Sequence, residues 1–166
     1  DIRTVGSKNI GATNVLRTQG SKSLAFATFL CDALKGTLGA YIALNYLNSD
    51  VSSCAIVSVL LGHMFPLWLK FKGGKGISTF FGITLYISPV VFLISIIVWG
   101  IAFKITKISA VGGLSSIISA FVCTFFTLFG TYTNYTVVYL VMMILIIYKH
   151  KDNILRIING NEKSFK

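Results

Sequence analysis

Long apolar runs alternate with short polar segments along the chain, and this pattern predicts helices that cross a membrane. Four runs, at residues 24–47, 52–69, 109–129 and 136–148, have about the length that a crossing helix needs, or slightly less. That length is roughly 20 residues for a hydrocarbon core of about 30 Å. The pattern therefore predicts an all-α fold, a polytopic integral membrane helix bundle.

A fifth apolar segment, residues 77–103, is predicted to form two short helices. Proline lacks an amide hydrogen and disfavours a helical residue before it, so Ser88-Pro89 marks a break. Helices over 77–88 and 89–103 would measure about 18 and 22 Å at 1.5 Å per residue, each less than a full crossing. With these two, we expect about six hydrophobic helices in the chain.

The distribution of charge predicts which segments face the cytoplasm. The chain has 15 Lys and Arg residues, five Asp and Glu residues and a formal net charge of +10. The basic residues gather in short segments beside the apolar runs, at 3–22, 70–75, 104–107 and 149–156. The positive-inside rule places such segments in the cytoplasm and leaves 48–53 and 130–135 outside. This assignment requires segment 77–103 to reverse its direction.

The composition excludes several other classes of protein. Hydrophobic residues make up 54% of the chain and charged residues only 12%, whereas about a quarter of a soluble domain is charged. Because the basic residues lie beside apolar runs, anionic lipid or a phosphorylated substrate is the expected counter-charge, and nucleic acid is not an expected partner. Cys31, Cys54 and Cys123 lie inside apolar runs without metal-ligand spacing, so neither a disulfide framework nor a metal site is predicted.

The first polar cluster, residues 6–17, combines small, hydroxyl and amide residues and ends at Arg17. Glycine lets a backbone approach a ligand, hydroxyls and amides donate hydrogen bonds, and a guanidinium matches phosphate or carboxylate. An ordinary interfacial loop with an arginine that reaches water would have the same composition, and both interpretations stay open. In the first, Asn9, Thr13 and Asn14 are candidate ligands of a phosphate group.

The second cluster is a lysine- and glycine-rich turn that leads into a predicted helix at residue 77. Backbone amides, the positive end of a helix dipole and ammonium groups together favour an anion. The candidate phosphate-binding residues are His63, Lys72, Gly73, Gly74, Lys75 and Gly76. The spacing of a nucleotide-binding P-loop is absent. A flexible positive-inside loop with a hydrogen-bonded interfacial His63 remains the alternative.

Other polar residues lie within or just after apolar runs. Asp32 and Lys35 are one helical turn apart, and we expect a structural ion pair because isolated charges are costly in a membrane. His150, Asn153 and Arg156 recur every third residue, which places them on one helix face. A basic tail that binds acidic lipid would also account for this last segment.

Small residues at every fourth position predict close contacts between helices. One set consists of Gly36 and Ala40, and another of Gly112, Ser116 and Ala120. Small side chains let helix backbones approach closely where no hydrophobic effect drives them together.

Three separated motifs together resemble the bacterial acyl-phosphate:glycerol-3-phosphate acyltransferase family. They are Gly-Ser-Lys-Asn-Ile-Gly-Ala-Thr-Asn-Val-Leu-Arg at 6–17, Gly-His-Met-Phe-Pro through Phe-Lys-Gly-Gly-Lys-Gly at 62–76, and His-Lys-Asp-Asn-Ile-Leu-Arg at 150–156. Asp32-x-x-Lys35-Gly36 also fits the family pattern, and the resemblance runs nearly from end to end.

The resemblance implies a multi-pass enzyme of the bacterial cytoplasmic (inner) membrane with its active site facing the cytoplasm. Such an enzyme transfers a fatty acyl group from acyl phosphate to the sn-1 hydroxyl of glycerol-3-phosphate, the first step of phospholipid synthesis. The products are lysophosphatidic acid and phosphate, and neither a metal, another cofactor nor acyl-CoA is expected. Because the family carries one more helix before its first motif, we expect residues 1–166 to form a single acyltransferase domain that lacks this helix.

The resemblance also assigns roles to residues of the three motifs. It implies that Ser7 and Arg17 are active-site residues and that His150 and Asn153 serve catalysis. It implies that the turn at 73–76 binds the phosphate of glycerol-3-phosphate. Glu162 corresponds to the structurally important acidic residue of the family.

Acyl phosphate is already activated, so direct attack by the substrate hydroxyl is the favoured mechanism. His150, His63 or the substrate's own phosphate would accept the proton. An acyl-enzyme on Ser7 is less favoured because no neighbouring base indicates a triad. The competing class is a transporter of a small phosphorylated anion, which predicts internal repeats and polar groups near the midplane. The predicted polar motifs lie on one face of the membrane, which favours an enzyme.

Overall fold

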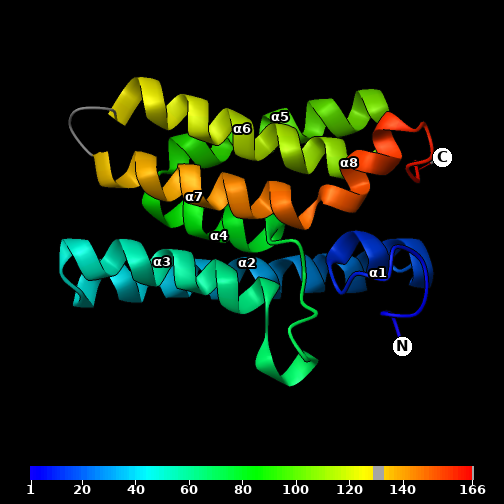
Figure 1. Cartoon of the computed structure of the whole chain (residues 1–166), viewed down its shortest axis with the longest axis horizontal. Coiled ribbons are helices and arrows are strands. Elements are labelled where there is room, and N and C mark those ends of the chain that lie inside the picture. Colours follow the sequence, from blue (N-terminus) through cyan, green and yellow to red (C-terminus); the bar gives the residue numbers. More distant parts are fainter. Residues whose placement is uncertain (129–132, 166) are drawn as a thin grey trace. The chain divides into compact units, whose positions relative to one another are not determined.

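The structure is a computed structural model of the chain and describes residues 1–128 and 133–165. Within these residues all regular structure is helical, as predicted (Figure 1). It forms two compact units, Asp1–Tyr86 and Ile87–Lys166. The helices are α1 (Ala12–Gln19), α2 (Lys22–Tyr46), α3 (Ser49–Met64), η1 (Leu67–Leu69, a 3-10 turn), α4 (Ile77–Ile87), α5 (Pro89–Thr106), α6 (Ser109–Leu128), α7 (Thr133–Lys149) and α8 (Lys151–Ile158).

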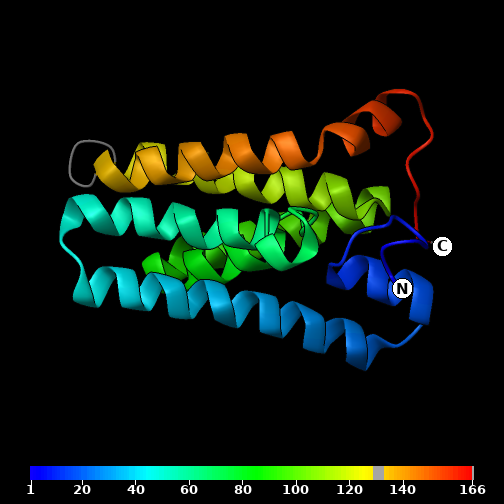
Figure 2. The ribbon, with the colours of Figure 1, turned by 60° about the horizontal axis from the view of Figure 1, so that its bottom comes forward.

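In the first unit, α2 and α3 run side by side in opposite directions (Figure 2). Side-chain oxygens cap both helices: Ser21 Oγ accepts from the amide of Leu24, and Asn48 Oδ1 accepts from that of Val51. α3 ends at Met64, because proline at position 66 disfavours a helical residue before it. The apolar run predicted over 52–69 is therefore an α-helix followed by a separate turn.

Glycines bring α2 and α4 into direct backbone contact. A Cβ at Gly36 would overlap the main chain of Thr79, and a Cβ at Gly82 would overlap that of Ala33. The hydroxyl of Thr37 donates to the carbonyl of Gly82 at 2.9 Å. The close packing predicted for Gly36 is thus confirmed, since no larger residue fits this crossing.

The second unit contains the other predicted set of small residues. A Cβ at Gly112 on α6 would lie 3.0 Å from the carbonyl oxygen of Trp99 on α5, and Ser116 and Ala120 are fully buried. The chain returns to the corner between these helices after α8, where the amide of Phe165 donates to the carbonyl of Lys107 at 2.9 Å.

The break at Ser88 is confirmed, but the length predicted for the second short helix is wrong. Ser88 Oγ caps α5 by accepting from the amide of Val91, and Pro89 is its first residue, where no amide donor is needed. α5 continues to Thr106, so its 18 residues span about 27 Å. A lysine near a helix C-terminus is favourable to the helix dipole, so Lys104 does not end the helix.

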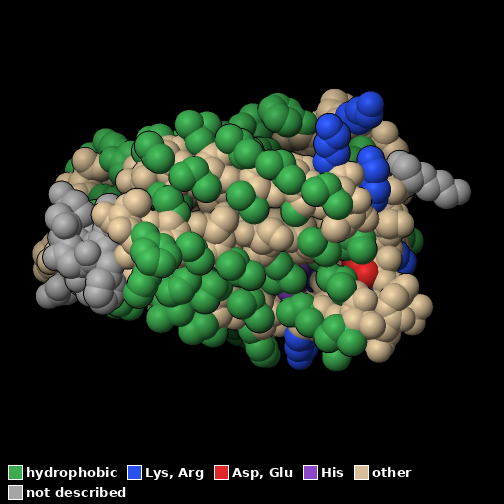
Figure 3. Space-filling model, turned by 90° about the horizontal axis from the view of Figure 1, so that it is seen from above, with side chains coloured by type: hydrophobic (Ala, Val, Ile, Leu, Met, Phe, Trp, Pro, Cys, Tyr) green, Lys and Arg blue, Asp and Glu red, His purple; other side chains and the backbone are tan. Residues whose placement is uncertain are grey.

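Among the described residues, three stretches are long and apolar enough to cross a membrane: Val51–Leu69, Pro89–Thr106 and Ser109–Thr127. Large hydrophobic side chains also stay exposed on the helices, and Figure 3 shows them over much of the face that it draws. α5 carries a stripe of them at intervals of three and four residues: Val90, Leu93, Ile97, Ile101 and Ile105. Such a stripe is suited to lipid.

Two predictions about membrane topology are not tested. The reversal expected within 77–103 concerns helices on both sides of the boundary between the units. The segment 130–135, expected outside, and the end of the run 109–129 lie partly outside the described residues.

Candidate active site

Asn14 organises the N-terminal loop that contains Ser7. Its side chain is buried on α1, with only 1% of the residue exposed. Asn14 Oδ1 accepts from the amide of Ser7 at 2.7 Å. Asn14 Nδ2 donates to the carbonyls of Ile2, Val5 and Asn9 at 3.0, 3.2 and 2.8 Å. This geometry favours a structural role for Asn14 over the predicted phosphate contact, because both ends of the amide already bind backbone.

The other predicted residues of this cluster lie in the same loop or on α1. Gly6 has a left-handed φ of 64°, and a Cβ there would overlap Asn14 Oδ1, so glycine is required. Thr13 and Arg17 are half-buried on α1. Asn9 Oδ1 is buried and has no hydrogen-bond partner among the described residues, so this side chain has capacity for a ligand.

The glycine turn at 73–76 lies against the end of α3. The amide of Gly73 donates to the carbonyl of Met64 at 3.1 Å, and the amide of Gly74 donates to the carbonyl of His63 at 3.2 Å. The helix ends here, so these two carbonyls need donors from outside the helix. Both amides therefore already bind α3, and the phosphate binding expected of this turn stays a prediction.

α4 begins at Ile77, directly after this turn. The positive end of its dipole therefore lies at the turn, where an anion is favoured. Lys75 is half-buried beside it, and Lys72 is exposed.

Asp32 joins two of the predicted site residues. Lys35 Nζ lies 2.5 Å from Asp32 Oδ1, so the expected ion pair is present. His63 Nδ1 lies 3.5 Å from the same oxygen, which is a polar contact longer than a well-formed hydrogen bond. His63 is buried, and its ring would overlap a Cβ placed at Gly74. No pattern in the sequence indicates this contact, because His63 and Gly74 belong to different elements.

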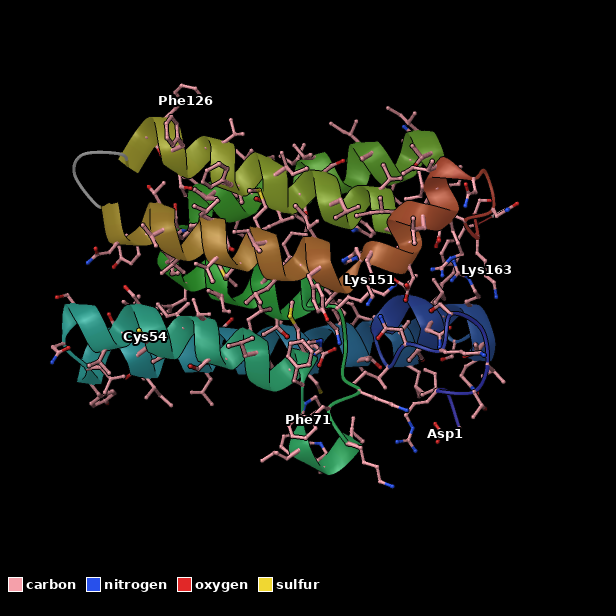
Figure 4. The ribbon with its side chains drawn as sticks, viewed as in Figure 1. Asp1, Cys54, Phe71, Phe126, Lys151 and Lys163 are labelled. Atoms are coloured by element: carbon pink, nitrogen blue, oxygen red, sulfur yellow. The ribbon has the colours of Figure 1, made fainter. Side chains whose placement is uncertain are left out.

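In the second unit, His150 lies buried between α7 and α8. Its Nδ1 is 2.8 Å from the carbonyl oxygen of Ile146. A carbonyl only accepts, so Nδ1 carries the hydrogen, and Nε2 is the nitrogen that can accept a proton. Figure 4 labels Lys151, the first residue of α8, directly after this histidine.

Glu162 binds two polar residues of α8. Asn153 Nδ2 donates to Glu162 Oε1 at 2.8 Å, and Arg156 Nε donates to Glu162 Oε2 at 2.7 Å. Of the three residues expected on one helix face, Asn153 and Arg156 therefore lie together on α8, whereas His150 precedes this helix. The side chain of Glu162 is only 5% exposed, which agrees with the structural role expected of it, whereas that of Arg156 is 40% exposed.

The predicted site residues thus form local groups in each unit. The first unit contains the loop around Asn14 and the group of Asp32, Lys35, His63 and the glycine turn. The second contains His150 and the carboxylate-linked pair on α8. Convergence of the three motifs at one site stays a prediction.

The chain is similar in sequence to a known protein family and to several of its members. Residues 1–160 match the family described as Glycerol-3-phosphate acyltransferase. The glycerol-3-phosphate acyltransferase of Pelagibacter ubique is 42% identical over 168 residues, which covers 100% of this chain and 84% of the relative. That of Bartonella quintana is 44% identical over 169 residues, with 98% of this chain and 77% of the relative covered.

Two solved structures are also similar. Both are crystal structures of PlsY (YgiH), an integral membrane glycerol 3-phosphate acyltransferase. Its glycerol 3-phosphate form has a TM-score of 0.93 and 38% identity, with 100% of this chain and 82% of that chain covered. Its lysophosphatidic acid form has a TM-score of 0.90 and 37% identity, with 97% of this chain and 82% of that chain covered.

Proposed function

Because the chain belongs to the glycerol-3-phosphate acyltransferase family, we propose that it transfers a fatty acyl group from acyl phosphate to the sn-1 hydroxyl of glycerol-3-phosphate. One observation carries the proposal: the chain is similar over its full length to a relative solved in glycerol 3-phosphate and lysophosphatidic acid forms. The acyl-phosphate donor is supported by the sequence motifs alone.

The charges of the first unit suit two substrates that both carry phosphate. Arg17 on α1, Lys72 and Lys75 on the glycine turn, and the N-terminal end of α4 are cationic or partly positive. Holding two anions together orients the hydroxyl toward the acyl carbon and stabilises charge on the departing phosphate. We propose the two lysines and the helix terminus as phosphate ligands, because the amides of Gly73 and Gly74 donate to α3.

In the proposed reaction, the sn-1 hydroxyl oxygen forms an ester bond with the acyl carbon. The bond from that carbon to the phosphate oxygen breaks, and phosphate leaves with the electron pair. The proton passes from the hydroxyl to His150 Nε2, whose role is supported by the hydrogen bond that keeps hydrogen on Nδ1. Asn153 and Glu162 support the start of α8 beside this histidine.

We also propose that the glycine turn faces the cytoplasm at the surface of the bacterial inner membrane. Trp68 on the loop after α3 is 80% exposed, and Phe71, which projects from the same loop in Figure 4, is 59% exposed. Lys70 and Lys72 flank Phe71, and Lys70 lies two residues after Trp68. Aromatic residues beside lysines favour a membrane interface with anionic lipid, and basic loops favour its cytoplasmic side.

The test is an assay of phosphate release by the purified full-length protein in a bilayer. We expect release that requires both acyl phosphate and glycerol-3-phosphate, fails with acyl-CoA, and is abolished in Arg17→Ala. Arg3→Ala is the matched control, because Arg3 pairs with Asp1 on the exposed part of the same loop. Uptake of glycerol-3-phosphate into vesicles without ester formation would instead support the transporter.

A further inference from the structure

We propose that His63 is a positioning residue for the glycine turn at 73–76, and that Gly74 is required because the His63 ring fills the space where its side chain would lie. This inference rests on the proposed role of the turn in binding glycerol-3-phosphate. A substitution of Gly74 would then weaken glycerol-3-phosphate binding because the new side chain overlaps the His63 ring, and not because a backbone hydrogen bond to the substrate is lost.

The backbone contacts leave little freedom to this turn. The amides of Gly73 and Gly74 bind the carbonyls of Met64 and His63. Gly76 has a φ of 90°, and a Cβ there would come within 2.6 Å of the Met64 methyl group. The turn therefore follows the surface of the last residues of α3.

The ring of His63 is confined on two sides. Its Nδ1 faces Asp32 Oδ1 at 3.5 Å. On the other edge, a Cβ at Gly74 would overlap Nε2 and lie 2.6 Å from Cε1. The side chain of His63 is almost fully buried, so it cannot swing into solvent to make room for a larger residue.

This confinement also argues against His63 as the proton acceptor. One ring nitrogen faces Asp32 and the other lies against the turn, so a substrate hydroxyl has no direct approach to either. We therefore assign His63 to the geometry of the turn and leave proton transfer to the proposed His150.

The experiment is a double-mutant cycle with His63→Ala and Gly74→Ala, read as KM for glycerol-3-phosphate and as kcat. Gly74→Ala should raise KM about tenfold, the effect of roughly 1.4 kcal/mol of lost binding, because the ring and the new methyl group displace the turn. In the double variant the space left by the ring accepts the methyl group, so KM should return to within about threefold of the wild-type value.

Gly73→Ala supplies the matched control for rescue. Its Cβ would meet the backbone carbonyls of His63 and Met64 and the ring of Pro66, none of which His63→Ala removes. His63→Ala should therefore leave the defect of Gly73→Ala unchanged. If His63→Ala only made the protein more tolerant of substitutions in general, it would instead rescue the KM of both glycine variants.

A second measurement does not depend on activity. Hydrogen exchange at the amides of residues 73 and 74 should accelerate in Gly74→Ala and slow again in the double variant. The proposal would be overturned if, in both measurements, the effect of the double variant were the product of the effects of the two single variants. So would a His63→Ala variant that loses kcat at unchanged KM, since this result indicates a proton acceptor. A wild-type protein without acyl transfer refutes the proposed function, whereas the exchange experiment still tests the contact.

Discussion

Replacing Asn14 by aspartate tests whether this residue organises the N-terminal loop or binds substrate phosphate. The substitution keeps the size of the side chain and the oxygen that accepts from Ser7. It removes the two amide hydrogens that the carbonyls of Ile2, Val5 and Asn9 share. A carboxyl oxygen then faces three carbonyl oxygens inside a buried site.

The structure sets the size of the expected effect. At roughly 1 kcal/mol for each lost hydrogen bond, with an added cost for buried groups left without partners, the closed loop loses about 2 to 3 kcal/mol. The open population of residues 1–11 should therefore rise about 30- to 150-fold. The loss is local, because the amide bonds only this loop.

Hydrogen exchange measured by mass spectrometry should show faster exchange at residues 1–11 in Asn14→Asp, with acyl transfer reduced because Ser7 is no longer held. Gln19→Glu makes the same amide-to-acid change at an exposed position of α1 and should alter neither measurement. If Asn14→Asp leaves exchange unchanged and raises only the KM for glycerol-3-phosphate, Asn14 is a phosphate ligand and the structural assignment is refuted.

Substitutions at Glu162, at two helix glycines and around Trp68 test other features of the structure. Glu162→Ala should lower the free energy of unfolding in detergent by about 1 to 3 kcal/mol, because it leaves the buried amide of Asn153 without its acceptor; an unchanged melting temperature would contradict this. Gly82→Leu should prevent folding because it forces α2 and α4 apart. Gly100→Leu on α5 should fold normally, because a Cβ there meets nothing within 4 Å. Circular dichroism and size-exclusion chromatography can check both outcomes. In a Trp99→Phe variant, Trp68 is the remaining tryptophan of the chain. Its fluorescence should be quenched by lipids brominated near their carbonyl groups. Quenching mainly by aqueous iodide would place this loop in water instead.

Much of the fold was predictable because periodicity and apolar length are local properties of the sequence. The break at Ser88 follows from the chemistry of proline and was predicted correctly. The two errors lie at helix ends, where the residues next to the boundary decide whether the helix continues. α5 passes through Lys104 because a lysine stabilises a helix C-terminus, and α3 ends at Met64 because Pro66 cannot continue it.

The site was predictable only as a set of residues. The motifs indicate which side chains are polar, but their partners depend on how loops fold back. Asn14 binds backbone atoms up to 12 residues away, and the amides of the glycine turn bind a helix end that precedes them. No periodic pattern encodes such contacts, so the sequence alone could not separate ligands from residues that shape the site.

The contact between the His63 ring and Gly74 has a consequence for natural variation and for engineering. The two positions share one volume, so evolution can enlarge one only while shrinking the other. Homologues that carry alanine or serine at the position of Gly74 should have a smaller side chain at the position of His63. A redesign of acceptor specificity should accordingly vary both positions in one library.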